Sequence, residues 1–420
     1  MATESLTSLL DRVNRDPRDL HAYQGLVQLF TARGHLEQAR ALEEALHRHA
    51  SAFEARAPIA TDSAHAPRDR EAVLAFLREA DPKSQIDLIA AVAGEYLDLN
   101  LEDSEVQAAL VRCESAHFAA LLPRCTALHT RFRQRSYRLT CLVSTYASAA
   151  FIEECLDDLV AQTIFADTEV LIIDACSPQN EAELARPYLN KYDNIRYFIT
   201  PERIGIYPAW TMGSMFASAP YVTPFSTNDR LVPHAYETLV DALDNHPAAT
   251  LVYGDSYLTD KPHQKIGAGP PSGFYRWPDI DYGWLMLNCG VGPQPMWRKA
   301  AHEHVGYFDR RYKATGDQDF FLRHARRNGL LHVPEITGMA WITDDSLSGH
   351  PSALSEALDI HVKHFKSVCM RVPLAARTEA WQILRRRYVE YVTKLPQQGC
   401  AKEAQELQRR HGSFFSQVPE

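Results

Sequence analysis

Between residues 137 and 255 the chain alternates between short apolar runs and amphipathic segments of helical length. The apolar runs, rich in β-branched and aromatic residues, cover residues 137–144, 169–174, 194–198, 221–225 and 250–255. The amphipathic segments between them cover residues 149–162, 180–188 and 207–217, and another begins at Pro233. Such alternation is typical of a parallel sheet with helices on both faces. The sequence therefore predicts an α/β fold for this half of the chain.

Polar side chains stand where three of these predicted strands end. Thr145 and Tyr146 follow the first strand, Asp174 ends the second, and Asn228 and Asp229 follow the fourth. The carboxyl ends of parallel strands meet at one edge of the sheet, where α/β folds bind their ligands. Asp229 by itself is typical of a turn or a helix N-cap. Its place at the same edge as the other four residues predicts a shared binding site instead.

Several short motifs of this region occur in a characteristic order. They are Pro201-Glu202-Arg203-Ile204-Gly205, Ser226-Thr227-Asn228-Asp229, Gly292-Pro293-Gln294-Pro295-Met296-Trp297-Arg298, Gly306-Tyr307-Phe308-Asp309, and Gly316-Asp317 followed by Phe320-Phe321. Together with the strand ends, this set resembles the family-2 glycosyltransferases, whose nucleotide-sugar-binding fold is called GT-A. It is especially similar to the spore-coat polysaccharide type. The resemblance extends over residues 137–348, while no G-x-x-x-x-G-K-[ST] or G-x-G-x-x-G motif points to another nucleotide-binding class.

The resemblance implies a metal-dependent, inverting glycosyltransferase of the hexosyltransferase kind. Asp229 corresponds to the ligand of a divalent metal, Mn²⁺ or Mg²⁺, whose shell is completed by the donor diphosphate and water. Such a cation neutralises the leaving diphosphate as a Lewis acid. Asp317 corresponds to the catalytic base that deprotonates the acceptor hydroxyl. Asp319, two residues further on, is the weaker candidate for that role.

The same resemblance implies how the donor is bound. Thr145 and Tyr146 would bound the nucleobase pocket, and Asn228 would reach the ribose. Asp174 and Arg203 also belong to the implied donor-binding set. The donor implied is a nucleoside-diphosphate sugar, with a UDP-sugar in first place, and the acceptor is a glycan, a lipid-linked glycan or a protein.

Some positions depart from the family's pattern. Ala175 stands where a second acidic residue usually follows, and Trp210 stands where the third helix usually carries Arg. Thr343 takes the place of a late His that can contact the metal, for which His350 could substitute. The usual D-x-D motif is reduced to Asp229. The alternative function is therefore a catalytically decayed GT-A domain that acts as a binding or scaffold protein.

Three further features have a functional and a structural interpretation. Trp284 could stack on a sugar face, although packing is the commoner fate of aromatic side chains. His302 and His304 alternate around Glu303, but on a helix this spacing splays the imidazoles apart, which favours a solvated turn. The basic run 385–387 could bind phosphate or an acidic partner; a solvated helix face is the interpretation that we favour.

The flanking regions are predicted to be helical. Residues 1–134 form a predicted accessory domain, 135–350 the GT-A domain, and 351–420 a C-terminal helical region. Individual helices are predicted at residues 70–80, 84–97, 104–133, 354–365 and 374–391, and a long loop at residues 259–282. Residues 20–49 have the spacing of a tetratricopeptide-type hairpin, but no convincing second copy follows. We expect the accessory domain to set the choice of acceptor or partner.

Net charge, the length of apolar runs and the spacing of cysteines exclude further classes of protein. The formal net charge of −9 argues against a dedicated nucleic-acid or anionic-membrane binder. No run approaches eighteen apolar residues and the N-terminus has no signal-peptide pattern, so we expect a cytoplasmic protein of bacterial type without a membrane span. The eight cysteines include no C-x-x-C pair, which predicts reduced thiols rather than disulfides or a zinc site.

Overall fold

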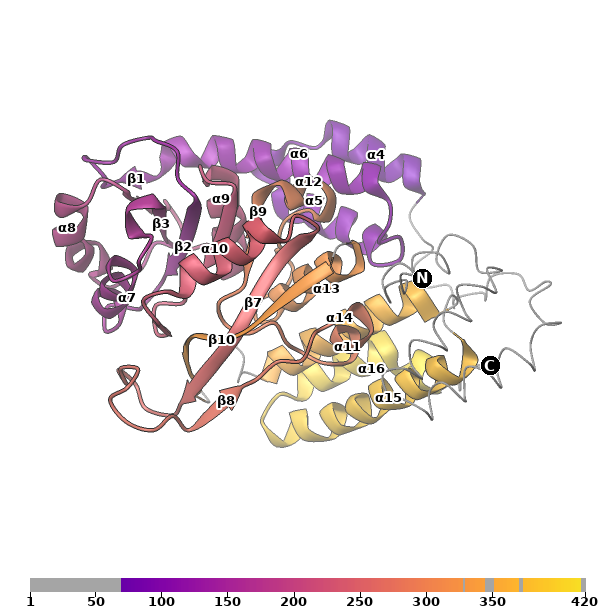
Figure 1. Ribbon diagram of the computed structural model, residues 1–420. Coiled ribbons are helices and arrows are strands. Elements are labelled where there is room, and N and C mark those ends of the chain that lie inside the picture. Colours follow the sequence, from indigo (N-terminus) through magenta and orange to yellow (C-terminus); the bar gives the residue numbers. More distant parts are fainter. Residues whose placement is uncertain (1–68, 328, 344–350, 370–372, 417–420) are drawn as a thin grey trace, which may run out of the picture.

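A ten-stranded sheet organises the part of the chain that the structure, a computed structural model, describes: residues 69–327, 329–343, 351–369 and 373–416 (Figure 1). Its strands are β1 (Thr126–Ala127), β2 (Leu139–Thr145), β3 (Thr168–Asp174), β4 (Ile195–Ile199), β5 (Tyr221–Pro224), β6 (Arg230–Leu231), β7 (Ala249–Thr259), β8 (Gly273–Tyr275), β9 (Met296–Arg298) and β10 (Gly329–Trp341). Their order across the sheet is β1-β4-β3-β2-β5-β9-β7-β10-β6, with β8 paired to β7.

The pairing directions bring several carboxyl ends to the same edge. Strands β4, β3, β2 and β5 are mutually parallel, and Thr145 on β2 lies opposite Asp174 on β3. Strand β9 runs antiparallel to both β5 and β7, while β10 runs parallel to β7. The ends of β7 and β10 therefore point the same way as those of β2, β3 and β5. The predicted α/β class with a mostly parallel sheet is confirmed, and the antiparallel neighbours are β1 at one edge and β9, β8 and β6 beyond β5.

Helices cover both faces of the sheet. They are α4 (Arg70–Glu79), α5 (Pro82–Leu97), α6 (Ser104–Leu121), α7 (Ile152–Val160), α8 (Glu181–Lys191), α9 (Ile206–Phe216), α10 (Ala235–Asn245), α11 (Tyr282–Leu287), α12 (His302–Val305), α13 (Gly316–Arg327), α14 (Pro351–Cys369), α15 (Leu374–Gln397) and α16 (Ala401–Ser416). Side chains alternate between the faces of a strand. On β2, Cys141 and Val143 join the core under α7, α8 and α10, while Leu142 joins the core under α9 and α13.

The helices before and after the sheet lie on different sides of it (Figure 1). Helices α4, α5 and α6, at the top of the view, share a small apolar core of their own, and α6 also packs against α12. Helices α14, α15 and α16, at the lower right, join the core that contains α9 and α13. The described flanking helices are thus continuous with the central fold through side-chain packing.

Three predicted elements need correction. The helix expected over residues 104–133 ends at Leu121, because Pro123 has no N–H to continue it. The chain then forms β1, which pairs with β4, so the last residues of the predicted accessory domain belong to the sheet. The loop expected over residues 259–282 contains β8, which forms a hairpin with β7.

Strand β10 is the longest strand that the sequence analysis did not predict. Pro334 lies in its middle, and a proline argues against a central strand because it cannot donate to the ladder. The pairing with β7 shifts register between Val333 and Ile336, so the proline lies in an irregularity of the ladder. The sequence pattern alone had no sign of this accommodation.

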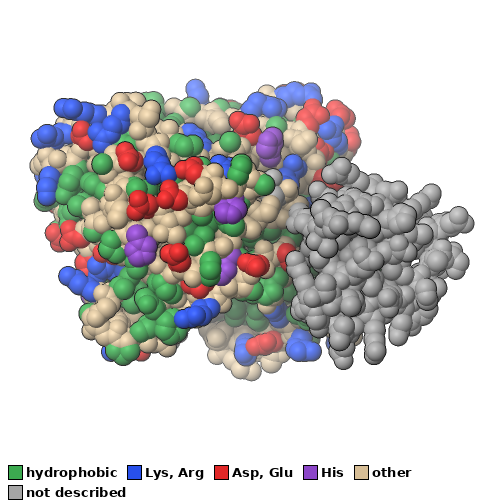
Figure 2. All heavy atoms as spheres, in the orientation of Figure 1, with side chains coloured by type: hydrophobic (Ala, Val, Ile, Leu, Met, Phe, Trp, Pro, Cys, Tyr) green, Lys and Arg blue, Asp and Glu red, His purple; other side chains and the backbone are tan. Residues whose placement is uncertain are grey.

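Two other expectations concern the whole chain. The hairpin predicted at residues 20–49 lies outside the described residues, and the domain boundaries stay predictions. Over the described ranges, each helix is too short or too polar to cross a membrane. Acidic and basic side chains are interspersed over the face that Figure 2 shows, as expected for a chain without a single dominant charge.

Candidate active site

Two of the predicted donor-binding residues are neighbours at the ends of β2 and β3. Thr145 is buried, and its Oγ1 has no hydrogen-bond partner within the described part of the chain. The Asp174 carboxylate opposite it accepts a hydrogen bond from the Ser177 N–H (2.7 Å) and one from the Tyr197 hydroxyl (2.8 Å). Burial raises the pKa of Asp174. Asp174 therefore fixes the turn after β3, and Thr145 has an unused polar atom beside it.

Two more of these residues stack on each other above the same edge. Tyr146 follows β2 and Arg203 follows β4, so they come from loops at the carboxyl ends of two strands. The Arg203 guanidinium lies 4.1 Å from the centre of the Tyr146 ring. Both side chains are exposed. The pair presents an aromatic face and a cation to solvent beside Thr145.

Asp229 lies in the loop between β5 and β6 and is only 6 % exposed. Its Oδ1 accepts a long hydrogen bond (3.3 Å) from the N–H of Trp341, at the end of β10. Burial raises the pKa of Asp229 to about 7, because the described residues place no cation beside it. Asn228, which precedes it, is half-buried.

The neighbouring cation is turned away from Asp229. Arg230 is bound by Asp158 of α7 through two contacts, Nε–Oδ2 at 2.6 Å and Nη2–Oδ1 at 2.7 Å, and by Glu154 at 3.2 Å. Arg230 begins β6 and its guanidinium is directed to α7, whereas Asp229 lies in the loop before that strand. Asp229 thus has no cationic partner among the described residues, in a buried position that disfavours its negative charge.

This environment fits a divalent cation. A carboxylate oxygen is the hard ligand that Mg²⁺ and Mn²⁺ prefer, and a desolvated carboxylate without a cationic partner gains most from one. The described residues contain no group of three or more His, Cys, Asp or Glu side chains arranged to hold a metal. Among the described residues, Asp229 would therefore be the protein ligand at this edge of the sheet, with a bound diphosphate and water as further ligands.

Asp317 begins α13 and is linked to the strand ends through α9. Its Oδ1 accepts hydrogen bonds from the Tyr207 hydroxyl (3.2 Å) and from the Gln318 N–H (3.0 Å). Three residues after Tyr207, the Trp210 indole N–H donates to Ser144 Oγ near the end of β2 (3.2 Å). Burial raises the pKa of Asp317, so its carboxylate is a stronger base than an exposed one.

The residue before Asp317 has to be small. A Cβ on Gly316 would come within 2.9 Å of the Tyr207 ring. The Gly-Asp pair therefore lets Tyr207 approach the start of α13 closely enough to hold the carboxylate. The backbone just before it is held from the other side by Glu356 of α14, which accepts hydrogen bonds from the N–H groups of Lys313, Ala314 and Thr315 at 2.8–3.0 Å.

Asp319 has a different environment from Asp317. Its Oδ1 lies 2.6 Å from Lys363 Nζ and 3.0 Å from His364 Nε2, and its Oδ2 lies 2.9 Å from Arg323 Nε. Burial acts to raise the pKa of Asp319, but the charges of Lys363 and Arg323 outweigh it and hold the pKa well below its ordinary value. This carboxylate is committed to tying α13 to α14.

The weaker candidates are placed as follows. Trp284 packs edge-to-face against Trp277, 6.5 Å between ring centres, so its ring belongs to an aromatic cluster. His350 lies outside the described residues. His302 is not on a solvated turn as expected: it is buried and accepts a hydrogen bond from the Trp297 indole N–H (2.9 Å). It is buried because the turn from the 3₁₀ helix η3 (Lys299–Ala301) to α12 faces the core.

Sequence reasoning missed the residues that hold the two aspartates. Tyr207, Glu356 and Lys363 are far from Asp317 in the chain, and their types are common on ordinary helices. Only the packing of α9 and α14 against α13 shows their role. A polar residue that acts through a long-range contact leaves no local pattern in a single sequence.

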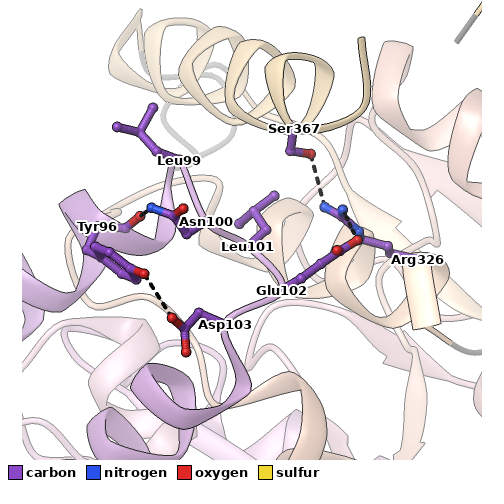
Figure 3. Close-up of a pocket in the computed structure, with 8 residues that line it drawn as sticks. All are labelled: Tyr96, Leu99, Asn100, Leu101, Glu102, Asp103, Arg326 and Ser367. Carbon is purple, nitrogen blue, oxygen red and sulfur yellow. Dashed lines mark hydrogen bonds and ion pairs between the residues drawn. The ribbon is translucent and has the colours of Figure 1, made fainter. Parts of the chain in front are cut away.

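A pocket of about 220 Å³ lies elsewhere, between the α5–α6 loop and helices α13 and α14 (Figure 3). Its lining side chains bond one another, since Arg326 contacts Ser367 (3.0 Å) and Glu102 (2.6 Å) and the Tyr96 hydroxyl donates to Asp103 (2.8 Å). The predicted site residues do not line this pocket. It is a gap between packed elements and not part of the candidate site.

Comparison with known proteins agrees with this geometry. Residues 140–292 match the sequence model of the family described as "Glycosyl transferase family 2". An uncharacterized glycosyltransferase of Mycoplasma pneumoniae, the MG025 homolog, is 28% identical over 106 residues, which are 25% of this chain and 36% of that protein. The uncharacterized glycosyltransferase YibD of Escherichia coli is 28% identical over 103 residues, 24% of this chain and 29% of that protein. The match thus spans about a third of these curated relatives.

Solved structures are similar to this chain at lower sequence identity. The TarS 1–349 structure of S. aureus in complex with UDP-GlcNAc is 15% identical with a TM-score of 0.46, covering 66% of this chain and 92% of that one. The mannosyltransferase PcManGT of Pyrobaculum calidifontis, in complex with GDP-Man and Mn²⁺, is 13% identical with a TM-score of 0.44, covering 78% and 87%. These scores are too low to carry an inference about this chain. The family match covers the ends of β2, β3 and β5, so the region that holds the predicted donor-binding residues is similar to glycosyltransferase family 2.

Proposed function

We propose that this chain is a metal-dependent, inverting glycosyltransferase that moves a sugar from a nucleoside-diphosphate sugar to a hydroxyl of a glycan, a lipid-linked glycan or a protein. Asp229 is the observation that carries the proposal. It is a buried carboxylate at the binding edge of the sheet, and the described residues give it one long hydrogen bond and no cation. Such a charge is costly unless a ligand compensates it.

The donor would bind across the ends of β2, β3 and β5. The Tyr146 ring and the Arg203 guanidinium, 4.1 Å apart, offer a stacking face and a positive charge to a nucleotide. The hydroxyl of Thr145, next to them, has no partner among the described residues, and Asn228 carries an amide in the loop after β5. Asp229 would hold Mn²⁺ or Mg²⁺, which supplies positive charge to the leaving diphosphate when it is bound.

Asp317 would act on the acceptor. As the acceptor oxygen forms its bond to the anomeric carbon, Asp317 takes the hydroxyl proton, and the bond from that carbon to the diphosphate oxygen breaks with its electron pair leaving on the diphosphate. Burial raises the pKa of Asp317, which makes the carboxylate better suited to receive a proton. The Tyr207 hydroxyl and the Gln318 N–H orient the carboxylate.

Calorimetry tests the metal and donor parts of the proposal. UDP and GDP are titrated into the protein with and without Mn²⁺, using wild type, Asp229→Ala, and Asp167→Ala as a control at the opposite end of β3. We expect at least one nucleotide to bind wild type and the control more tightly with Mn²⁺, and Asp229→Ala to lose this difference. Unchanged Mn²⁺-dependent binding in Asp229→Ala would remove the metal assignment. Absence of nucleotide binding by wild type would favour the scaffold function.

A further inference from the structure

A second charged side chain approaches the surroundings of Asp317, from the C-terminal helix α15. Arg387 is half-buried, and its Nη1 lies 3.5 Å from Nδ1 of His361 on α14. His361 Nε2 in turn lies 3.4 Å from the side-chain amide nitrogen, Nε2, of Gln318, the residue after Asp317. A short chain of contacts therefore joins the α15 guanidinium to the start of α13. The basic run 385–387 is thus not uniformly a solvated face, which corrects our expectation for Arg387.

Cys289 is the fourth member of this group, which we call the α15 cluster: Arg387, His361, Gln318 and Cys289. Its Sγ lies 4.0 Å from His361 Nε2. The residue is reachable by solvent, yet burial raises the pKa of its thiol to about 11, and the Asp317 carboxylate raises it further while Arg387 lowers it. His361 therefore contacts Arg387, Gln318 and Cys289, which places all three close to the residue that follows Asp317.

Arg387 has no carboxylate partner within the described part of the chain. Glu390, three residues further on the same helix, is paired with Lys394 at 2.6 Å. His361 adds no charge, because burial and then the Arg387 charge lower its pKa to about 3 and keep it neutral. A guanidinium has five N–H donors in a planar fork, and among the described residues Arg387 has one hydrogen-bonding contact, the 3.5 Å approach to His361.

We propose that Arg387 binds an anionic group of the sugar acceptor, a phosphate or a carboxylate, and thereby brings an acceptor hydroxyl to Asp317. Arginine is the side chain best matched to these groups, because its fork makes two parallel hydrogen bonds to them. The Asp317 carboxylate would repel an anionic acceptor. Arg387, in the α15 cluster, supplies the charge that compensates this repulsion. This inference rests on the proposed transferase function and specifies its acceptor class.

Alkylation of Cys289 gives a direct measure of occupancy that needs no catalysis. The full chain is treated with neutral iodoacetamide at mildly alkaline pH, and labelling of each cysteine is followed by peptide mass spectrometry. Cys176, the other exposed free cysteine, follows β3 on the donor side and reports on that side separately. The probes are glucose 6-phosphate and glucuronic acid, with glucose as the neutral control and UDP with Mn²⁺ as the donor-side control.

We expect glucose 6-phosphate or glucuronic acid to slow the labelling of Cys289 about fivefold at a probe concentration of about four times its Kd, since only unoccupied protein reacts. Glucose should not slow it, and labelling of Cys176 should not change with either anionic sugar. Comparison of the two anionic sugars identifies whether Arg387 binds a phosphate or a carboxylate. Arg387→Gln should lose the protection and Arg387→Lys should keep part of it. Each variant is compared with itself without probe, because Arg387 also shifts the Cys289 pKa.

Arg386→Gln is the matched control, because it is the next residue of the same helix and is exposed. It should behave as wild type. The inference is overturned if neither anionic sugar protects Cys289, if glucose protects equally well, if Cys176 is protected together with Cys289, or if Arg387→Gln keeps the protection. Failure of UDP to protect Cys176, or to bind by calorimetry, would count against the donor proposal instead. The Cys289 result would still test anion binding at the α15 cluster.

Discussion

Two aspartates at the start of α13 have opposite electrostatic environments although they are two residues apart. Asp317 is a half-buried carboxylate that accepts hydrogen bonds from the Tyr207 hydroxyl and the Gln318 N–H, and burial raises its pKa. Asp319 is held among Lys363, Arg323 and His364, which keep its pKa low. A desolvated carboxylate with a raised pKa lowers the stability of the fold when it is ionised, whereas an ion-paired carboxylate with a lowered pKa raises that stability. This contrast separates a candidate catalytic role from a structural one.

Substitution of each aspartate should therefore change stability in opposite directions. Asp319→Asn leaves the buried Lys363 with less compensation, so we expect a loss of about 3 kcal/mol in the free energy of unfolding. Asp317→Asn removes a desolvated charge and should leave the free energy of unfolding unchanged or raised at neutral pH. Urea unfolding measures both values. A larger loss in Asp317→Asn than in Asp319→Asn would contradict the assigned environments.

At the scale of elements, α6 carries a buried carboxylate against the α12–α13 region. Glu114 is 4 % exposed, and burial raises its pKa to about 8, with Arg310 and Arg323 acting against the rise and Asp309 adding to it. Helices α6 and α12 are packed together. The docking of α6 should therefore depend on pH in a range where an exposed Glu does not titrate.

The sign follows from the two pKa values of Glu114, about 8 folded and 4.5 in its ordinary state. Between them the folded protein holds a proton that the unfolded chain has lost, so the free energy of unfolding falls as pH rises, by up to about 1.4 kcal/mol per pH unit. Glu114→Gln should not show this contribution and should be the more stable protein at pH 8.

Unfolding curves measured across this pH window check the prediction. Glu105→Gln on the same helix is the control, because the exposed carboxylate of Glu105 pairs with Arg70 at the surface. Its stability should follow the pH dependence of wild type. Equal slopes for wild type and Glu114→Gln would show that Glu114 has an ordinary pKa.

At the scale of the whole molecule, buried charges connect three segments that the sequence separates. Asp98, at the end of α5, contacts Arg311 (2.9 Å) and Lys363 of α14 (3.2 Å), and Lys363 also contacts Asp319 of α13. The N-terminal helices, the sheet domain and the C-terminal helices therefore share one charge network. The described part of the predicted accessory domain is bound to the rest of the fold.

A chain that begins at Arg135 should consequently be less stable than the full chain, beyond the loss of its own helices. It lacks β1 and the Asp98 carboxylate, so a sheet edge is exposed and Arg311 and Lys363 lose a partner. Thermal unfolding of the shortened chain, compared with Asp98→Asn in the full chain, measures the two contributions. A shortened chain with the melting temperature of the full chain would show that the helical region is a separable module.

The sequence predicted the parallel strands well, because buried strands such as β3 are almost wholly apolar and are bounded by amphipathic helices. It placed Thr145, Asp174 and Asp229 at one edge for the same reason. It missed β10, whose Pro334 breaks the local pattern, and it extended α6 beyond Leu121. The partners of Asp317 and Asp319 depend on packing between distant helices, which no local pattern records.

The catalytic role of Asp317 is the central claim, and the turnover of Asp317→Asn tests it most directly. Hydrolysis of a UDP- or GDP-sugar with Mn²⁺, with water as the acceptor, is measured alongside donor affinity for wild type, Asp317→Asn and Asp319→Asn, per mole of folded protein. Loss of a general base lowers kcat by about 10²–10⁴-fold and leaves donor binding nearly intact, so this is the result that we predict for Asp317→Asn. Asp319→Asn should lose much less. Normal turnover by Asp317→Asn would contradict the account, and normal turnover together with an inactive Asp319→Asn would move the base by two residues.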